Sequence, residues 1–164
     1  MTLKIVPWPH PCLKTKAKNV TKVTSEILQL WTDMIAVMEK MPGVGLAAPQ
    51  LGIALSLAVV DASLERGKVI RMANPEVLHA SQKIEVGKEA SSNLAYVSSK
   101  IKRPRGITIR YLNELGVIQE RDLVGFWARS TLHQIDHVHG RMYFDNLSKL
   151  KRGMLIKKAE KLCA

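Results

Sequence analysis

The chain has 164 residues, 46% of them hydrophobic, which suits a single domain with its own core. The formal net charge of +11 predicts attraction to anionic partners such as RNA or acidic protein surfaces. No stretch approaches the roughly 20 apolar residues of a membrane span, and the opening residues lack the pattern of a secretion signal. We therefore expect one domain over residues 1–164 in the cytoplasm, with no membrane contact and with Cys12 and Cys163 as free thiols.

The first predicted helix runs from Ser25 to Lys40, because apolar residues recur there at steps of three and four. These residues are Ile27, Trp31, Met34 and Met38. Thr24 or Ser25 can cap the helix at its start, and Pro42 followed by Gly43 ends it. A tight glycine-rich turn follows over residues 43–50.

Short strands come next, separated by turn residues. We expect them at Leu55–Val60, Lys68–Met72, Ile84–Val86, Ile107–Tyr111 and Val117–Leu123. Two further helices cover about Val124–His139, which ends at Gly140, and Lys149–Leu162. The predicted order is therefore one helix, several short strands and then two helices. This order is typical of an α+β fold and differs from the regular alternation of strands and helices that builds a parallel sheet.

The helix over 124–139 carries His133 and His137, which lie four residues apart and therefore share one helix face. Two imidazoles so placed can bind one metal ion, although such a pair is also common as plain structure. A metallohydrolase places a glutamate directly after the first histidine, to take a proton from the metal-bound water. Here that residue is Gln134, whose amide has no basic site near neutral pH.

A second motif is Gly43-Val44-Gly45-Leu46-Ala47-Ala48-Pro49-Gln50. Its small residues let the backbone approach a ligand closely, and Gln50 offers an amide donor for a carbonyl oxygen. Taken alone, the segment is equally explained as a tight turn before a strand.

The two motifs together closely resemble the peptide deformylase family. The resemblance extends to Pro9-His10-Pro11-Cys12-Leu13, to Asn74-Pro75 and to the segment 137–145. It implies antiparallel sheets around a central HxxxH helix, followed by a C-terminal helix.

The family's third motif is Glu-Gly-Cys-Leu-Ser, whose cysteine is the remaining metal ligand. Counting back from Ile101-Lys102-Arg103 aligns it with Glu89-Ala90-Ser91-Ser92-Asn93, which puts Ser91 at the cysteine position. As the resemblance implies, His133, His137 and Ser91 would form a degenerate metal site. Gln134, Gln50 and Gly45 take the catalytic positions. Val44, Gly45, Leu46 and Ser92 take the substrate-binding ones, the last through its backbone N–H.

The family binds Fe²⁺, Zn²⁺ or Ni²⁺, but a hydroxyl is a far poorer ligand than a thiolate. We therefore expect no metal or a weakly bound one, and a protein that is inactive or severely impaired as a deformylase. The alternative is an active peptide deformylase with altered metal ligation, which removes the formyl group from the N-terminal methionine of new proteins. Hydrolysis of some other amide or ester stays open.

Three neighbours of the site have plainer explanations. We expect Glu89 to make a polar contact between strand and helix, Asp136 to support the helix, and His139 to lie on the surface.

The tail from Lys149 to Ala164 is strongly basic, with an apolar stripe of Leu150, Met154, Leu155 and Leu162. By analogy with bacterial deformylases, it predicts docking on the ribosome beside the nascent polypeptide N-terminus. A packed terminal helix with a solvated basic face explains it as well. Because no aromatic residues alternate with the basic ones, we expect no sequence-specific nucleic-acid binding.

Overall fold

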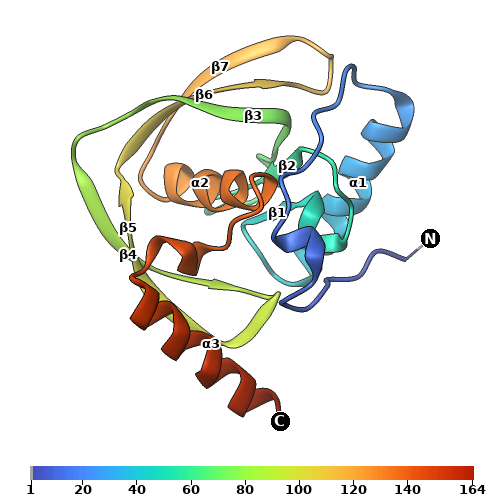
Figure 1. Ribbon diagram of the computed structural model, residues 1–164. Helices are drawn as coiled ribbons and strands as arrows, with labels where there is room; N and C mark the ends of the chain where they lie inside the picture. The colour runs from blue at the N-terminus through green and yellow to red at the C-terminus, as the bar shows by residue number, and fades with distance from the viewer. Residues whose placement is uncertain (1) are drawn as a thin grey trace.

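The computed structural model describes residues 2–164 and has the predicted α+β organisation, with sheets built from antiparallel strands (Figure 1). Its helices are α1 (Ser25–Lys40), α2 (Phe126–Val138) and α3 (Lys149–Cys163). Its strands are β1 (Gly45–Ala47), β2 (Leu57–Val60), β3 (Ile70–Ala80), β4 (Ile84–Ser91), β5 (Leu94–Pro104), β6 (Gly106–Leu112) and β7 (Ile118–Val124). Short 3₁₀ helices cover Pro11–Leu13, Ala48–Leu51 and Tyr143–Asn146. None of the helices in the described chain is long and apolar enough to span a membrane.

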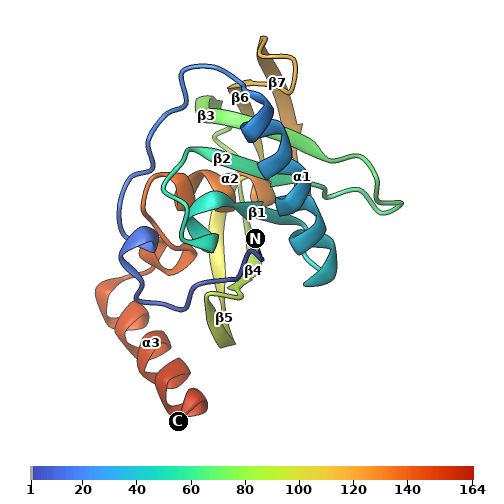
Figure 2. The same ribbon diagram turned by 90° about the vertical axis from the view of Figure 1, so that its right-hand side faces the viewer.

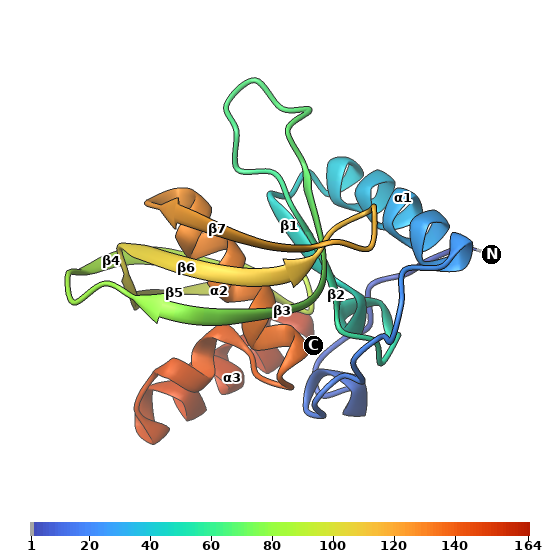
Figure 3. The ribbon, with the colours of Figure 1, turned by 90° about the horizontal axis from the view of Figure 1, so that it is seen from above.

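The strands form two sheets, a five-stranded one in the order β1-β2-β3-β6-β7 and the two-stranded hairpin β4-β5. Figures 1 and 3 show α2 lying between these sheets, with β3, β6 and β7 side by side above it. Its buried residues, which include Ala128, Ile135 and Val138, pack into one core with residues of β2, β3 and β6. The predicted central helix is therefore confirmed.

Helix α1 has the predicted bounds, because its local signals agree with one another. The Thr24 hydroxyl accepts a hydrogen bond from the backbone N–H of Ile27 (3.3 Å) and caps the first turn. All four residues of the predicted apolar face are buried. They pack against the outer side of β1 and β2, the side opposite α2 (Figure 2).

Two parts of the strand prediction were wrong. The glycine-rich segment 43–50 holds the short edge strand β1 and a 3₁₀ helix in place of a plain turn. Strand β5 was missed entirely, because its many lysines and serines give no clear alternation of apolar and polar residues. Its pairing with β4, from Ile84 opposite Pro104 to Ser91 opposite Leu94, makes it a strand.

The N-terminal segment is tied to the sheet by Asn74, which adopts a positive φ of 52° in a bulge of β3. Its side chain accepts a hydrogen bond from the Val20 N–H and donates one to the Val20 carbonyl, both at 2.8 Å. The Asn-Pro pair noted in the sequence therefore closes the chain onto itself across 54 residues.

Helix α3 begins at its cap, Ser148, and lies against β5 at one side of the molecule (Figure 2). Leu155 and Ile156 are partly buried, and Ala159 is fully so. Of the predicted apolar stripe, only Leu155 packs inward, since Leu150, Met154 and Leu162 are all more than half exposed.

Replacing Gly140 with alanine should destabilise the fold by about 1–3 kcal/mol. Gly140 follows α2 at φ 76°, and an added Cβ would lie 2.7 Å from the backbone of Thr15. Gly153→Ala is the matched control, since its added Cβ meets nothing within 4 Å and alanine favours the α3 helix. Thermal denaturation should show a lower Tm for Gly140→Ala and an equal or higher Tm for Gly153→Ala.

Candidate functional site

A cavity of about 540 Å³ opens between α2, the β4-β5 hairpin and the segment that leads into β1. Seven of the nine predicted site residues line it: Val44, Gly45, Gln50, Ser91, Ser92, His133 and Gln134. The other two do not. Leu46 of β1 is fully buried in the core that β1 and β2 form with α1. His137 has no exposed surface and is not among the residues that line the cavity.

Gln134 fits closely against the glycine-rich segment. A Cβ added to Gly45 would lie 2.6 Å from the Gln134 amide nitrogen, so only glycine leaves room for this side chain. The amide oxygen of Gln134 is buried and has no hydrogen-bond partner within residues 2–164. Gln134 lines the cavity, and the acceptor that it leaves unused is a buried one.

The Ser91 side chain is part of a polar network centred on Asn93. Its hydroxyl donates to the side-chain oxygen of Asn93 (3.0 Å), which also accepts from the Gln50 amide (2.8 Å). The Asn93 amide group in turn donates to the carbonyls of Val6 (2.6 Å) and Gln50 (3.1 Å). Asn93 thereby joins the N-terminal segment, the 3₁₀ helix Ala48–Leu51 and the hairpin turn at one point.

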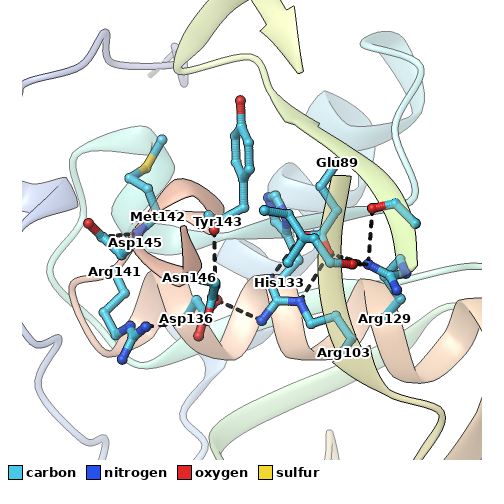
Figure 4. Close-up of polar contacts among 12 residues, drawn as sticks. Glu89, Arg103, Arg129, His133, Asp136, Arg141, Met142, Tyr143, Asp145 and Asn146 are labelled. Carbon is cyan, nitrogen blue, oxygen red and sulfur yellow. Dashed lines mark hydrogen bonds and ion pairs between the residues drawn. The ribbon is translucent and has the colours of Figure 1, made fainter. Parts of the chain in front are cut away.

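Glu89 is the anchor of a buried ionic cluster between the hairpin and α2 (Figure 4). It accepts two hydrogen bonds from Arg103, both at 2.9 Å, and one from Arg129 at 2.7 Å. Arg103 also pairs with Asp136 at 2.8 Å. Burial alone would raise the pKa of Glu89, but the hydrogen bonds from Arg103 and His133 outweigh it and lower this pKa to about 2.

The same carboxylate fixes the orientation of the histidines. His133 Nδ1 lies 2.9 Å from Glu89 Oε1, and because an ionised carboxylate only accepts, Nδ1 carries the proton. The ring of His137 lies 5.0 Å away, centroid to centroid. Burial, reinforced by His133 and Arg103, lowers the pKa of His137 well below its usual value, so this imidazole is neutral.

The three predicted metal positions do not fit a catalytic metal site. Imidazole is a suitable ligand, and both ring nitrogens of His137 are buried without a partner in the described chain. The third position fails, because the Ser91 hydroxyl is neutral and already donates to Asn93. Nowhere in residues 2–164 do three His, Cys, Asp or Glu side chains gather closely enough to hold an ion.

The plainer expectations for the neighbouring residues are confirmed. Glu89 makes the strand-to-helix contact through Arg129 and His133. Asp136 supports α2 by accepting hydrogen bonds from Arg103 (2.8 Å) and from the Asn146 amide (3.2 Å). His139 is exposed.

Sequence reasoning missed two groups of this site. Arg129 and Ser130 line the cavity on the same face of α2 as His133 and Gln134, and their spacing of four residues could have shown this. Asn93 was considered only as the last residue of the segment aligned with the family's third motif. Its role depends on contacts with residues 43 and 87 positions away, for which the sequence holds no signal.

Comparison with known proteins identifies the family and the fold. A sequence model described as polypeptide deformylase matches residues 2–153. The chain is 35% identical over 156 residues to a peptide deformylase of Mesorhizobium japonicum, which covers 94% of this chain and 89% of that protein. The chain belongs to the peptide deformylase family.

Other relatives give the same result. A peptide deformylase of Rhodopseudomonas palustris is 36% identical over 162 residues, covering 96% of this chain and 93% of that one. The crystal structure of a peptide deformylase from Legionella pneumophila superposes with a TM-score of 0.91 at 31% identity, covering 99% of this chain and 95% of that one. The one from Ehrlichia chaffeensis has a TM-score of 0.89 at 31% identity, with coverages of 98% and 96%. The predicted family and fold are confirmed, and the family is metal-dependent.

Replacing Glu89 with glutamine should cost about 3–5 kcal/mol of unfolding free energy, because it leaves two guanidinium groups without their buried carboxylate. Glu76→Gln is the matched control. It breaks a 2.7 Å pair with Arg110 in which both side chains are about half exposed, and should cost less than about 1 kcal/mol. Urea denaturation measures both, and equal losses in the two variants would contradict the importance of the buried cluster.

Proposed function

We propose that this chain is a deformylase-family protein that binds the N-terminal ends of polypeptides in its cavity but does not catalyse metal-dependent deformylation at an enzymatic rate. The observation that carries the proposal is the pair Ser91 and Gln134. The first puts a neutral, already engaged hydroxyl where a thiolate ligand is needed, and the second puts an amide where the general base is needed.

The cavity itself supports the binding half of the proposal. Its volume of about 540 Å³ is in the range of small-ligand sites, and its lining includes the apolar side chains Met41, Val97 and Phe126. The short strand β1 lies at the edge of the five-stranded sheet and supplies Gly45 to the cavity wall. A strand that ends a sheet and borders a cavity can pair with an extended peptide.

Active peptide deformylase is the second candidate. The relatives named above are all peptide deformylases, and the His133–His137 pair with its carboxylate partner Glu89 is intact. A carboxylate bound to the outer nitrogen of a histidine is the usual support of a metal ligand. This candidate needs a third ligand and a base that neither Ser91 nor Gln134 supplies.

Reverting both positions, Ser91→Cys with Gln134→Glu, separates the two candidates. We expect a double variant that hydrolyses a formyl-methionyl peptide at least about 10²-fold faster than the unmodified protein, each assayed with Fe²⁺, Ni²⁺ and Zn²⁺. The two single reversions serve as controls and should remain close to the unmodified protein, since ligand and base act as one unit. Robust turnover by the unmodified protein, with about one metal ion per chain, would sink the proposal.

We also propose that α3 docks on the ribosome, where nascent N-termini emerge. Its lysines, which include Lys151, Lys157 and Lys158, are exposed, and they form a basic surface suited to an anionic partner. A packed helix with a solvated basic face remains the simpler explanation that the experiment must exclude.

The charge reversal Lys157→Glu with Lys158→Glu should weaken co-sedimentation with ribosomes roughly tenfold at low salt, because electrostatic attraction dominates such contacts. Lys100→Glu with Lys102→Glu is the matched control, since it changes the net charge equally on exposed positions of β5. If both double variants lose the same binding, the attraction is general and α3 has no special part in it.

A further inference from the structure

Tyr96 of β5 has a backbone conformation that its side chain disfavours. Its φ is 72°, in the left-handed region where glycine is favoured and a bulky residue is strained. Within residues 2–164 two other residues that are not glycine have a positive φ, Arg66 at 61° and Asn74 at 52°. The Arg66 guanidinium donates to two backbone carbonyls, and the Asn74 side chain is bonded to the backbone of Val20. In both cases hydrogen bonds within the chain offset the strained backbone.

The side chain of Tyr96 offers the fold little in return. The residue is 73% exposed, and its ring takes no part in the aromatic pairs of the described chain. Glycine would adopt the same φ without strain, so tyrosine lowers the stability of the fold at this position. Strained backbone of this kind is concentrated at functional sites, where the side chain serves a ligand.

A bulge in the β4-β5 hairpin places Tyr96 at the cavity. Between the residue pairs 89–99 and 91–94, one residue of β4 lies opposite the four residues 95–98 of β5. Bulges are common next to binding sites, because they redirect a side chain out of the regular pattern of the strand. Tyr96 is accordingly one of the residues that line the cavity, and it is the most exposed aromatic residue among them.

The cavity lining around Tyr96 is suited to an apolar group. A second aromatic residue, Phe126, lines the same cavity and is 56% exposed. The acidic residue of the lining is Glu89, whose carboxylate is already paired with two arginines. A cationic side chain would therefore find no free carboxylate in the lining, whereas an apolar one can pack against the aromatic rings.

We propose that Tyr96 is a specificity-determining residue of the cavity, whose ring packs against a bulky apolar side chain near the N-terminal end of a bound polypeptide. This rests on the proposed function, that the cavity binds polypeptide N-termini, and it names the class of polypeptide that binds. The selected polypeptides carry leucine-like residues after the first position, in preference to small or cationic ones. The contact between ring and ligand then offsets the strained backbone of Tyr96 in the complex.

The test uses the full-length protein and three peptides, Met-Leu-Leu-Ser, Met-Ala-Ala-Ser and Met-Lys-Lys-Ser, each with a fluorophore at the C-terminus. Each peptide is prepared with a free and with a formylated N-terminus, and binding is followed by fluorescence anisotropy. We expect the leucine peptide to bind about tenfold more tightly than the other two, since the partial burial of one leucine side chain corresponds to roughly that factor.

Tyr96→Gly distinguishes a binding role from a structural one. It removes the ring and relieves the strained φ, so the preference for the leucine peptide should fall several-fold while the Tm stays equal or rises by about 2–4 °C. Tyr96→Phe keeps the ring and should keep the preference. Leu64→Ala is the matched control, because it removes a fully exposed apolar side chain that does not line the cavity, and it should leave the preference unchanged.

Each failure has its own outcome. Equal binding of the three peptides, or tightest binding of the lysine peptide, overturns the inference and leaves peptide binding in place. A preference that survives Tyr96→Gly also overturns it, as does a lower Tm of this variant, because the ring would then support the fold. If none of the peptides binds in either form, the proposed function fails together with the inference.

Discussion

The site depends on one buried carboxylate. Glu89 lies on β4 and accepts hydrogen bonds from β5 through Arg103 and from α2 through Arg129 and His133. Within residues 2–164 the one other ion pair that joins two of these elements is Arg103–Asp136, between β5 and α2, and the three elements together form two walls of the cavity. A buried carboxylate is costly unless its partners are complete, so the hairpin and the helix can approach only in the arrangement that supplies all of them.

The parts of this fold that the sequence predicts are those specified by near neighbours. Helix α1 shows this well, because its cap, its apolar spacing and its Pro42 stop all lie within the segment. The positions of His133 and Gln134 on α2 followed from helical periodicity, and Ser91 followed from counting residues against a family motif. Strand β5 could not be predicted, since it is held by pairing with β4 and not by its own pattern.

The altered site is well packed. The Ser91 hydroxyl finds an acceptor in Asn93, and Asn93 itself is bonded to Val6 and Gln50, so the change at position 91 is absorbed into a satisfied network. Position 134 is different, because its amide oxygen remains without a partner. Of the two altered positions, Gln134 is therefore the one that leaves a buried polar atom unpaired.

Gly87 and Arg129 extend this argument to the cavity wall. A Cβ at position 87 would lie 2.7 Å from Nε of Arg129, so the arginine occupies the space that any larger residue there would fill. With glycine on the strand, the guanidinium can reach the carbonyls of Glu85 and Ile101 at 2.8 and 2.9 Å as well as the carboxylate of Glu89. The inner wall is consequently polar where an alanine or larger side chain at position 87 would have made it apolar. The Arg129 side chain therefore lines the cavity with its donors engaged by the hairpin, while Phe126 contributes an exposed apolar side chain to the same lining.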